Sequence, residues 1–319
     1  MFYLFSILGI SIFYSFDFIY YLLPITVLFI AFNNIFDRYN NRVKNYKLMS
    51  YQRLIKTTIE SITSISLMFL FSIKSGMIWG FIFGYFISSF TMLYINYKSF
   101  TKSKLNPSIK KIKVLAKRYI NFPKYSMPHS FLNTLSANIP IFLIPFFYTS
   151  STLGLYAFGL KIVQAPLSIV SASMFNVLGQ KMAEEYSNGN EIKTLFENLV
   201  KKLFITVVLL LPIFIYMNNI FAIIFGTEWE QAGYFIQIMS PWILLVFIVS
   251  PLATIPQIYN KQKKALNIEI FRIIFQVMIL VGGGFYFSIE TTLLMLSLFS
   301  SAVMLYGFNW YYQLVRLEN

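Results

Sequence analysis

The residues of this sequence that could do chemistry are polar side chains spaced along one face of otherwise apolar segments. The first such face, in residues 153–179, has the spacing i, i+3, i+7 and i+10 and consists of Lys161, Gln164, Ser168 and Ser171. The second, in residues 126–148, has the spacing i, i+4, i+7 and i+11 and consists of His129, Asn133, Ser136 and Pro140. Polar faces of this kind turn toward a bundle interior or a water-filled cavity. The sequence therefore predicts binding of a polar or anionic ligand between helices.

Lys161 is the most informative of these residues. It lies about eight residues into its apolar segment, which places it about 12 Å deep at 1.5 Å per residue. A cation at the centre of a membrane helix costs about 2.5–3.5 kcal/mol on insertion scales. The Lys161 ammonium group therefore either faces a wet cavity or extends to the membrane interface along its flexible stem.

Other titratable residues also allow two interpretations each. Arg272 follows Glu269 by three residues, so the two share a helix face and either pair with each other or leave the arginine free for a ligand. His129, the only histidine, either forms a structural hydrogen bond or handles protons. Glu60 and Glu269 lie near span ends, where they are either solvated at the interface or bind a coupling cation.

The sequence lacks the residues of most catalytic and metal sites. It has no cysteine and one histidine, which excludes disulfides, thiolate ligands and a histidine cluster. It also lacks the phosphate-binding pattern G-x-x-x-x-G-K-[ST], so the chain does not itself use ATP to power transport. We therefore expect no enzymatic activity, no metal and no cofactor.

The elements that must position these residues are membrane-spanning helices. Hydrophobic residues make up 57% of the 319 residues, and charged residues make up only 12%, whereas a soluble protein usually has about 25%. A spanning helix needs about 20 mostly apolar residues. This rule predicts spans at residues 2–16, 18–36, 57–73, 76–97, 126–148, 153–179, 203–225, 233–259, 265–287 and 291–315. The expected fold class is all-α, a polytopic membrane helix bundle with about ten transmembrane helices.

Charge in the loops predicts the orientation of the chain. Most of the 26 lysines and arginines lie in alternate loops, mainly within residues 38–56, 98–124, 181–202 and 261–264. The positive-inside rule puts those loops and both termini in the cytoplasm. The net charge of +14 therefore sets topology, and we expect the lipid bilayer as a partner and no nucleic acid.

Small residues and prolines predict how the helices pack. Gly76, Gly80 and Gly84 form one face of a helix and predict close backbone contact with a neighbouring helix. Prolines remove backbone donors and kink helices, as in helices that line transporter cavities. The prolines within predicted spans are Pro24, Pro140, Pro145, Pro166, Pro212, Pro241, Pro251 and Pro256.

Several short motifs follow one another in an order found in a known family. They are FPKYSMP at 122–128, GLYAFGLK at 154–161, APLS at 165–168, FGTEWEQAG at 225–233, SPL at 250–252, and a basic loop at 41–47 followed by Arg53. Together they resemble the Wzx-like flippases of O-antigen and capsular polysaccharide repeat units. That family is part of the multidrug/oligosaccharidyl-lipid/polysaccharide exporter superfamily.

The resemblance implies a function and a site. Such flippases move oligosaccharides linked to undecaprenyl pyrophosphate across the bacterial cytoplasmic (inner) membrane, by alternating access through a cationic central cavity. Further implied partners are a polysaccharide polymerase and a chain-length regulator. Lys161 occupies a position where the family usually has a basic residue, so we expect it to contact diphosphate or acidic sugars. The other expected site residues are His129, Asn133, Gln164, Arg272 and Arg53.

The resemblance also implies two lobes with MATE-like architecture. Residues 119–319 would form a complete lobe of six helices. Residues 1–118 would form an incomplete N-terminal lobe of four, equivalent to helices 3–6 of the family. Because Met1 leads directly into an apolar segment, we expect a truncated or misassigned start.

Three other functions stay open at this point. A small-molecule or drug antiporter of the same fold would need acidic residues deep in its cavity. A membrane polysaccharide polymerase or ligase would need a sizeable outer loop with basic residues. A truncated chain with an incomplete lobe would be a non-functional remnant.

Overall fold

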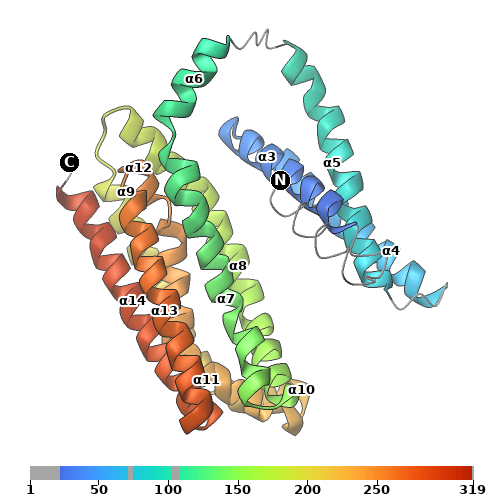
Figure 1. The fold of residues 1–319 in the computed structure, drawn as a ribbon, viewed down its shortest axis with the longest axis vertical. Helices are drawn as coiled ribbons and strands as arrows, with labels where there is room; N and C mark the ends of the chain where they lie inside the picture. The colour runs from blue at the N-terminus through green and yellow to red at the C-terminus, as the bar shows by residue number, and fades with distance from the viewer. Residues whose placement is uncertain (1–21, 71–74, 103–107, 318–319) are drawn as a thin grey trace, which may run out of the picture. The chain divides into compact units, whose positions relative to one another are not determined.

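The computed structural model describes residues 22–70, 75–102 and 108–317, and these residues are mostly helical (Figure 1). No strand occurs among them. Seven of the helical segments are long and apolar enough to cross a membrane, judged by length and composition. The predicted all-α, polytopic membrane helix bundle is confirmed.

Three of the ten predicted spans do not correspond to one of these seven segments. The first, 2–16, lies outside the described residues. The span predicted at 18–36 overlaps α3 (Leu23–Arg42), and the one predicted at 57–73 overlaps the second part of α4 (Tyr46–Phe69). Both helices run into the charged turn between them. Neither helix qualifies as a span in its described part, and residues 18–21 and 71–73 of the two predicted spans lie outside the described residues.

The chain divides into two compact units, Met1–Ser108 and Ile109–Asn319. The boundary expected from the sequence, between residues 118 and 119, lies ten residues later. The intervening basic segment forms α6 (Ile109–Arg118), which begins the second unit. The first unit contains α3, α4 and α5 (Gly76–Lys102).

Close packing of α4 against α5 depends on the glycine row. A Cβ atom added at Gly80 would lie 2.6 Å from the backbone oxygen of Glu60 and would overlap the hydroxyl of Ser64. One added at Gly84 would lie 3.1 Å from the backbone oxygen of Lys56. The predicted close backbone contact of this helix face is confirmed.

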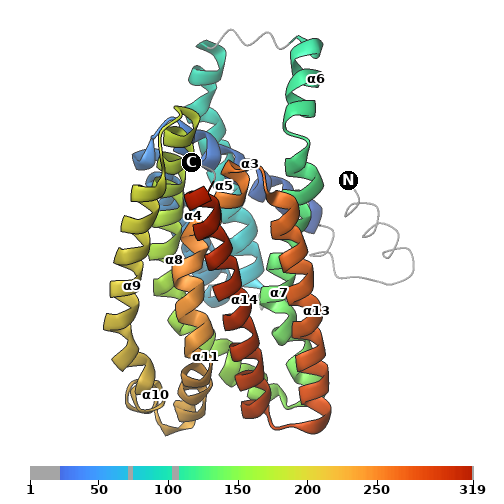
Figure 2. The ribbon, with the colours of Figure 1, turned by 90° about the vertical axis from the view of Figure 1, so that its left-hand side faces the viewer.

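The second unit is a bundle arranged around one central helix. Its further helices are α7 (Met127–Phe147), α8 (Ser150–Ser187), α9 (Lys193–Ile215), α10 (Met217–Phe225), α11 (Glu230–Val249), α12 (Ile255–Ile258), α13 (Gln262–Tyr286) and α14 (Ile289–Leu317). Helix α11 packs against α8, α9, α10 and α14 (Figure 2). Half of the residues in its apolar window are buried, against at most 39% in any other described span. The apolar core of this unit is therefore centred on α11.

Two predicted spans are interrupted where prolines occur. The single span expected at 203–225 is wrong, because the helix breaks at Tyr216 and α10 lies across the end of the unit (Figure 1). Pro212 lies one turn before this break and lacks a backbone donor. The span expected at 233–259 is interrupted by a 3₁₀ turn at Ser250–Leu252, which contains Pro251.

Candidate translocation site

A buried ion pair lies within α13, and a hydrogen bond from its arginine links α13 to α7. The Nη2 atom of Arg272 donates a hydrogen bond of 2.6 Å to Oε1 of Glu269, and the same nitrogen donates one of 2.8 Å to Oδ1 of Asn133 on α7. The side chains of Arg272 and Glu269 are only 8% and 7% exposed. The expected pairing of Arg272 with Glu269 is present, and it extends to one residue of the polar face predicted on α7.

Three further residues surround this ion pair. Gln276, one turn along α13, exchanges hydrogen bonds with the hydroxyl and the backbone oxygen of Ser136 on α7. His129 on α7 and Tyr311 on α14 both lie close enough to Glu269 and Arg272 for the two charges to act on them. The polar face of α7 therefore packs against α13, with Ser136 buried, His129 half-buried and Asn133 still exposed.

The geometry limits what Arg272 can do as a ligand for anions. Glu269 neutralises its charge, and both groups are buried. Both of its hydrogen bonds start from Nη2, and its buried Nε atom has no hydrogen-bond partner among the described residues. An arginine in this state holds two helices together, and only part of its guanidinium fork is left for a ligand.

Lys161 and Gln164 lie elsewhere, on the outer face of α8. Gly159 and Val163 of the same helix face the core, where Gly159 contacts Ile236 and Ala232 of α11. Lys161 is exposed and Gln164 is half-buried, and the structure shows no hydrogen bond or ion pair for either among the residues it describes. Of the predicted polar face of α8, Lys161 and Ser168 therefore point away from the core of the unit, whereas Ser171 is buried.

Arg53 belongs to the first unit and does not take part in either group. It is exposed on α4, where its charge and that of Lys56 act on Asp37 of α3. Burial raises the pKa of the Asp37 carboxyl above its usual value, and the two cations oppose that effect. Lys56 itself donates a 3.3 Å hydrogen bond to the hydroxyl of Tyr85 on α5. The basic face of α4 thus contributes to packing within its own unit.

A buried amide network in the same unit was not predicted from the sequence. The side-chain oxygen of Asn33 accepts hydrogen bonds of 2.7 Å from both Gln52 and Ser88, which joins α3, α4 and α5. The signal in the sequence was the presence of Asn33 and Gln52 on helix faces that are otherwise apolar. Gln276 was not predicted either. Its spacing of four from Arg272, which continues the polar face of α13, was the signal that could have identified it.

Two motifs in the sequence prove to be packing motifs. Phe158 stacks on Trp229 with ring centroids 4.1 Å apart, and it also contacts Phe225 at 5.1 Å. Gly233 allows the start of α11 to approach α10, because an added Cβ would lie 2.5 Å from the backbone oxygen of Met217. Gly226 has a φ of +103°, a conformation that favours glycine. The motifs GLYAFGLK and FGTEWEQAG therefore dock α8, α10 and α11 on one another.

We expect Trp229→Ala to lower the free energy of unfolding by about 2–4 kcal/mol, because it removes a large, partly buried ring and its aromatic contacts. Thermal unfolding of the purified protein in lipid nanodiscs measures this change. Tyr234→Ala is the matched control, since Tyr234 is an exposed aromatic residue in α11, five residues after Trp229. Equal destabilisation by both substitutions would contradict the packing role of Trp229.

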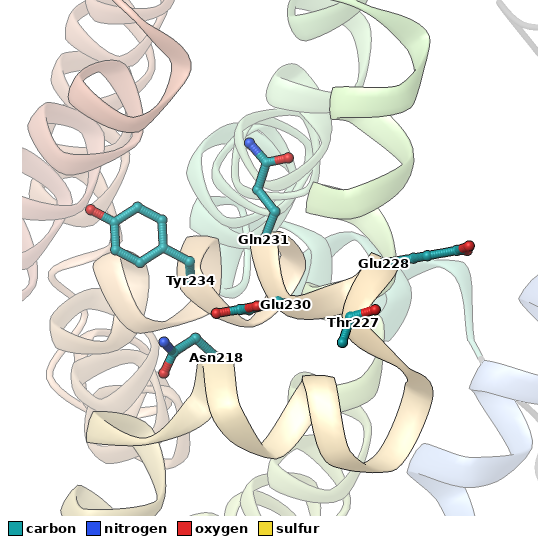
Figure 3. A pocket seen from close by; sticks show the side chains of 6 residues that line it. All are labelled: Asn218, Thr227, Glu228, Glu230, Gln231 and Tyr234. Atoms are coloured by element: carbon teal, nitrogen blue, oxygen red, sulfur yellow. The ribbon is translucent and has the colours of Figure 1, made fainter.

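Two hollows open on the surface of the second unit. One, of about 440 Å³, lies where α10 meets the start of α11 and is lined by Asn218, Thr227, Glu228, Glu230, Gln231 and Tyr234 (Figure 3). The other, of about 500 Å³, is a mostly apolar groove between α13 and α14 with Lys264 among its lining residues. That lysine lies over the ring of Trp310 at 4.8 Å. Neither hollow contains a residue predicted from the sequence to bind substrate.

The fold is similar to that of MATE proteins of known structure. A crystal structure of a single-residue mutant of MATE aligns with a TM-score of 0.67 and 12% identity, covering 90% of this chain and 66% of that chain. A crystal structure of MATE in the bent conformation aligns with a TM-score of 0.69 and 12% identity, covering 92% and 67%. This chain thus spans about two thirds of the length of these MATE chains.

The sequence then identifies the family within that fold. The sequence model of a family described as polysaccharide biosynthesis protein matches residues 2–234, which is more than half of the chain. The chain belongs to this family. No curated protein sequence gives a significant match. The expected polysaccharide biosynthesis family and the expected MATE-like fold are confirmed.

Proposed function

We propose that this protein flips oligosaccharide units linked to undecaprenyl pyrophosphate across the bacterial cytoplasmic membrane during surface polysaccharide biosynthesis. Membership in a polysaccharide biosynthesis family and the fold of a membrane transporter support this proposal. The observation that carries it is the exposed Lys161 on the polar outer face of α8.

The helix boundaries support a position of Lys161 deep within its span. Only Tyr148 and Thr149 separate α7 from α8, so α8 enters the membrane at about Ser150. Lys161 then lies about 16 Å along the helix, close to the middle of a hydrocarbon core of about 30 Å. A lysine side chain is too short to reach either interface easily from that depth. A cation there requires water or an anionic ligand beside it.

A lipid-linked oligosaccharide supplies such an anion. Its diphosphate and sugars cannot cross hydrocarbon unaided, whereas its polyprenyl tail stays in the surrounding lipid. A polar helix face with one central cation gives the head group hydrogen-bond partners and charge compensation. Lys161 suits this role better than Arg272, whose charge Glu269 already neutralises.

The same observations speak against a drug antiporter. Recognition of a cationic drug needs an unpaired carboxylate deep within the spans. Glu269 is the carboxylate that α13 contributes to the interior of the second unit, and it is paired with Arg272. A polymerase or ligase is also less well supported, because the fold is that of transporters.

The remaining parts of the proposal concern topology and partners. The basic loops place both termini in the cytoplasm, and substrate therefore enters from the cytoplasmic leaflet. Release on the opposite side delivers each unit to a polysaccharide polymerase and its chain-length regulator. Alternating access of this kind requires no cofactor of the chain's own.

We expect Lys161→Ala to reduce translocation about 10- to 100-fold, since a charge-assisted hydrogen bond contributes about 1.5–3 kcal/mol. The assay is translocation of lipid-linked oligosaccharide in cells that lack their own flippase. Lys161→Arg should retain most activity, and Lys181→Ala, an exposed lysine nearer the end of the same helix, should have no effect.

Two results would count against the proposal in different ways. Full activity of Lys161→Ala would remove Lys161 from the site and leave the function intact. No translocation by the unmodified chain, when it is present in the membrane in normal amounts, would contradict the proposed function itself.

A further inference from the structure

Helix α6 has two chemically distinct faces. Its ten residues, Ile109–Arg118, include five basic residues and no acidic residue. At 100° per residue the apolar side chains Ile109, Ile112, Leu115 and Ala116 fall on one side, and Tyr119 and Ile120 would extend that side beyond the helix. The other side carries the basic residues Lys110, Lys111, Lys113, Lys117 and Arg118, with Val114 as the one apolar residue among them.

The apolar face of α6 is open. No residue of this helix is buried, and Ile109, Ile112 and Leu115 are 72%, 50% and 51% exposed. An aliphatic face of this kind gains free energy when it is covered, by about 25 cal/mol for each Å² removed from water. Among the residues that the structure describes, none covers the apolar face of this helix.

The position of α6 indicates what that partner is. Only residues 119–121 separate it from the span Phe122–Phe147, and a trans peptide chain extends at most about 3.6 Å per residue. The end of α6 is thus held within about 14 Å of the point where that span enters the membrane. At this level an anionic membrane surface offers both an apolar layer for the isoleucines and leucine, and phosphate groups for the lysines.

We propose that α6 lies in the interface of the adjoining leaflet and binds the head groups of anionic phospholipids. The apolar face enters the boundary between head groups and acyl chains. The lysines extend outward to the phosphates along their flexible stems. An acidic protein surface would satisfy the charges, but it would not by its nature cover an aliphatic face located at the end of a membrane span.

This docking would have a structural consequence, because α6 begins at the boundary between the two units. The segment that connects them would be fastened to the lipid surface at Ile109. Any motion of one unit relative to the other would then occur with α6 bound to lipid. The rate of that motion would therefore depend on lipid composition.

Because the sequence contains no cysteine, a single cysteine can be introduced for labelling, and the proposal is directly measurable on the chain of 319 residues. Ile112→Cys introduces one attachment point for a spin label on the apolar face, and Val114→Cys introduces a matched one about 160° away on the helix. Each labelled protein is placed in nanodiscs of phosphatidylcholine, with or without phosphatidylglycerol. Collision with oxygen reports lipid exposure, and collision with a water-soluble nickel complex reports water exposure.

We expect the label at Ile112 to meet mainly oxygen in discs with phosphatidylglycerol, and the label at Val114 to meet mainly nickel. Removing lysines on the basic face, with Lys113→Gln and Lys117→Gln, should reduce the docked population about fivefold for each lysine. Discs without anionic lipid should show a similar loss.

Three outcomes would overturn the proposal. Equal nickel accessibility at Ile112 and Val114 would mean that α6 stays in water. Shielding of the Ile112 label from both reagents would mean that protein covers this face. Identical behaviour with and without phosphatidylglycerol would exclude anionic head groups as the ligand. None of these readouts depends on transport activity.

Discussion

Replacing Arg272 by methionine is expected to lower the free energy of unfolding by about 3–5 kcal/mol, because it leaves the buried carboxylate of Glu269 without its partner. Asn133 loses its hydrogen bond from Arg272 at the same time. Thermal unfolding in nanodiscs measures the loss of stability. The translocation assay in flippase-deficient cells measures the loss of activity.

A second variant separates folding from transport in this experiment. Glu269→Gln combined with Arg272→Met removes both charges, and buried ion pairs replaced as a whole are often neutral or even stabilising. We expect the double variant to regain most of the lost stability. If it regains activity as well, the ion pair has a structural role only. If it is stable and inactive, Arg272 or Glu269 takes part in translocation.

Replacing Gly80 by leucine is the other change with a large expected effect. Even a methyl group at this position would lie 2.6 Å from the backbone oxygen of Glu60, so α4 and α5 would have to separate. Overpacking of this kind costs about 1–3 kcal/mol or more. Helix association in membranes also depends on such close contact, because lipid competes equally well for apolar side chains. We expect a marked loss of folded protein, measured by size-exclusion chromatography and thermal unfolding.

Gly282→Ala is the control for this prediction, since nothing lies within 4 Å of a Cβ atom added there. Its expected effect is neutral or stabilising by up to about 1 kcal/mol, through the better helix propensity of alanine. Similar behaviour of Gly80→Leu and Gly282→Ala would show that the α4–α5 contact does not limit stability.

Much of the fold follows from the sequence because membrane helices are encoded locally. A run of apolar residues predicts a span, and the spacing of Gly76, Gly80 and Gly84 predicts a close contact without knowledge of the partner. The same local reasoning fails at Tyr216, because the apolar residues on either side of Asn218 and Asn219 were read as one span although the helix breaks there. It also fails for α4, which starts at Tyr46 within a polar segment and continues well into the predicted span.

The candidate site was predictable only in part, for a related reason. The polar face of α7 was evident from His129, Asn133 and Ser136. Its partner was not, because a polar face can meet water or another polar helix equally well. The structure places Arg272 and Gln276 of α13 against it. Tyr311 comes from a helix distant in sequence, and nothing in its local pattern distinguishes it from other aromatic residues of α14.

Helix α8 is much longer than a membrane span requires. Its 38 residues extend about 57 Å at 1.5 Å per residue, well beyond a hydrocarbon core of about 30 Å. The arm from Lys161 to Ser187 is about 39 Å long, so a tilt of about 10° around Lys161 moves its far end by about 7 Å. That arm contacts Thr254 through Gly179, and Tyr259 through Tyr186. A small tilt of α8 around Lys161 would therefore displace the segment that leads into α13 much more than the residues next to Lys161.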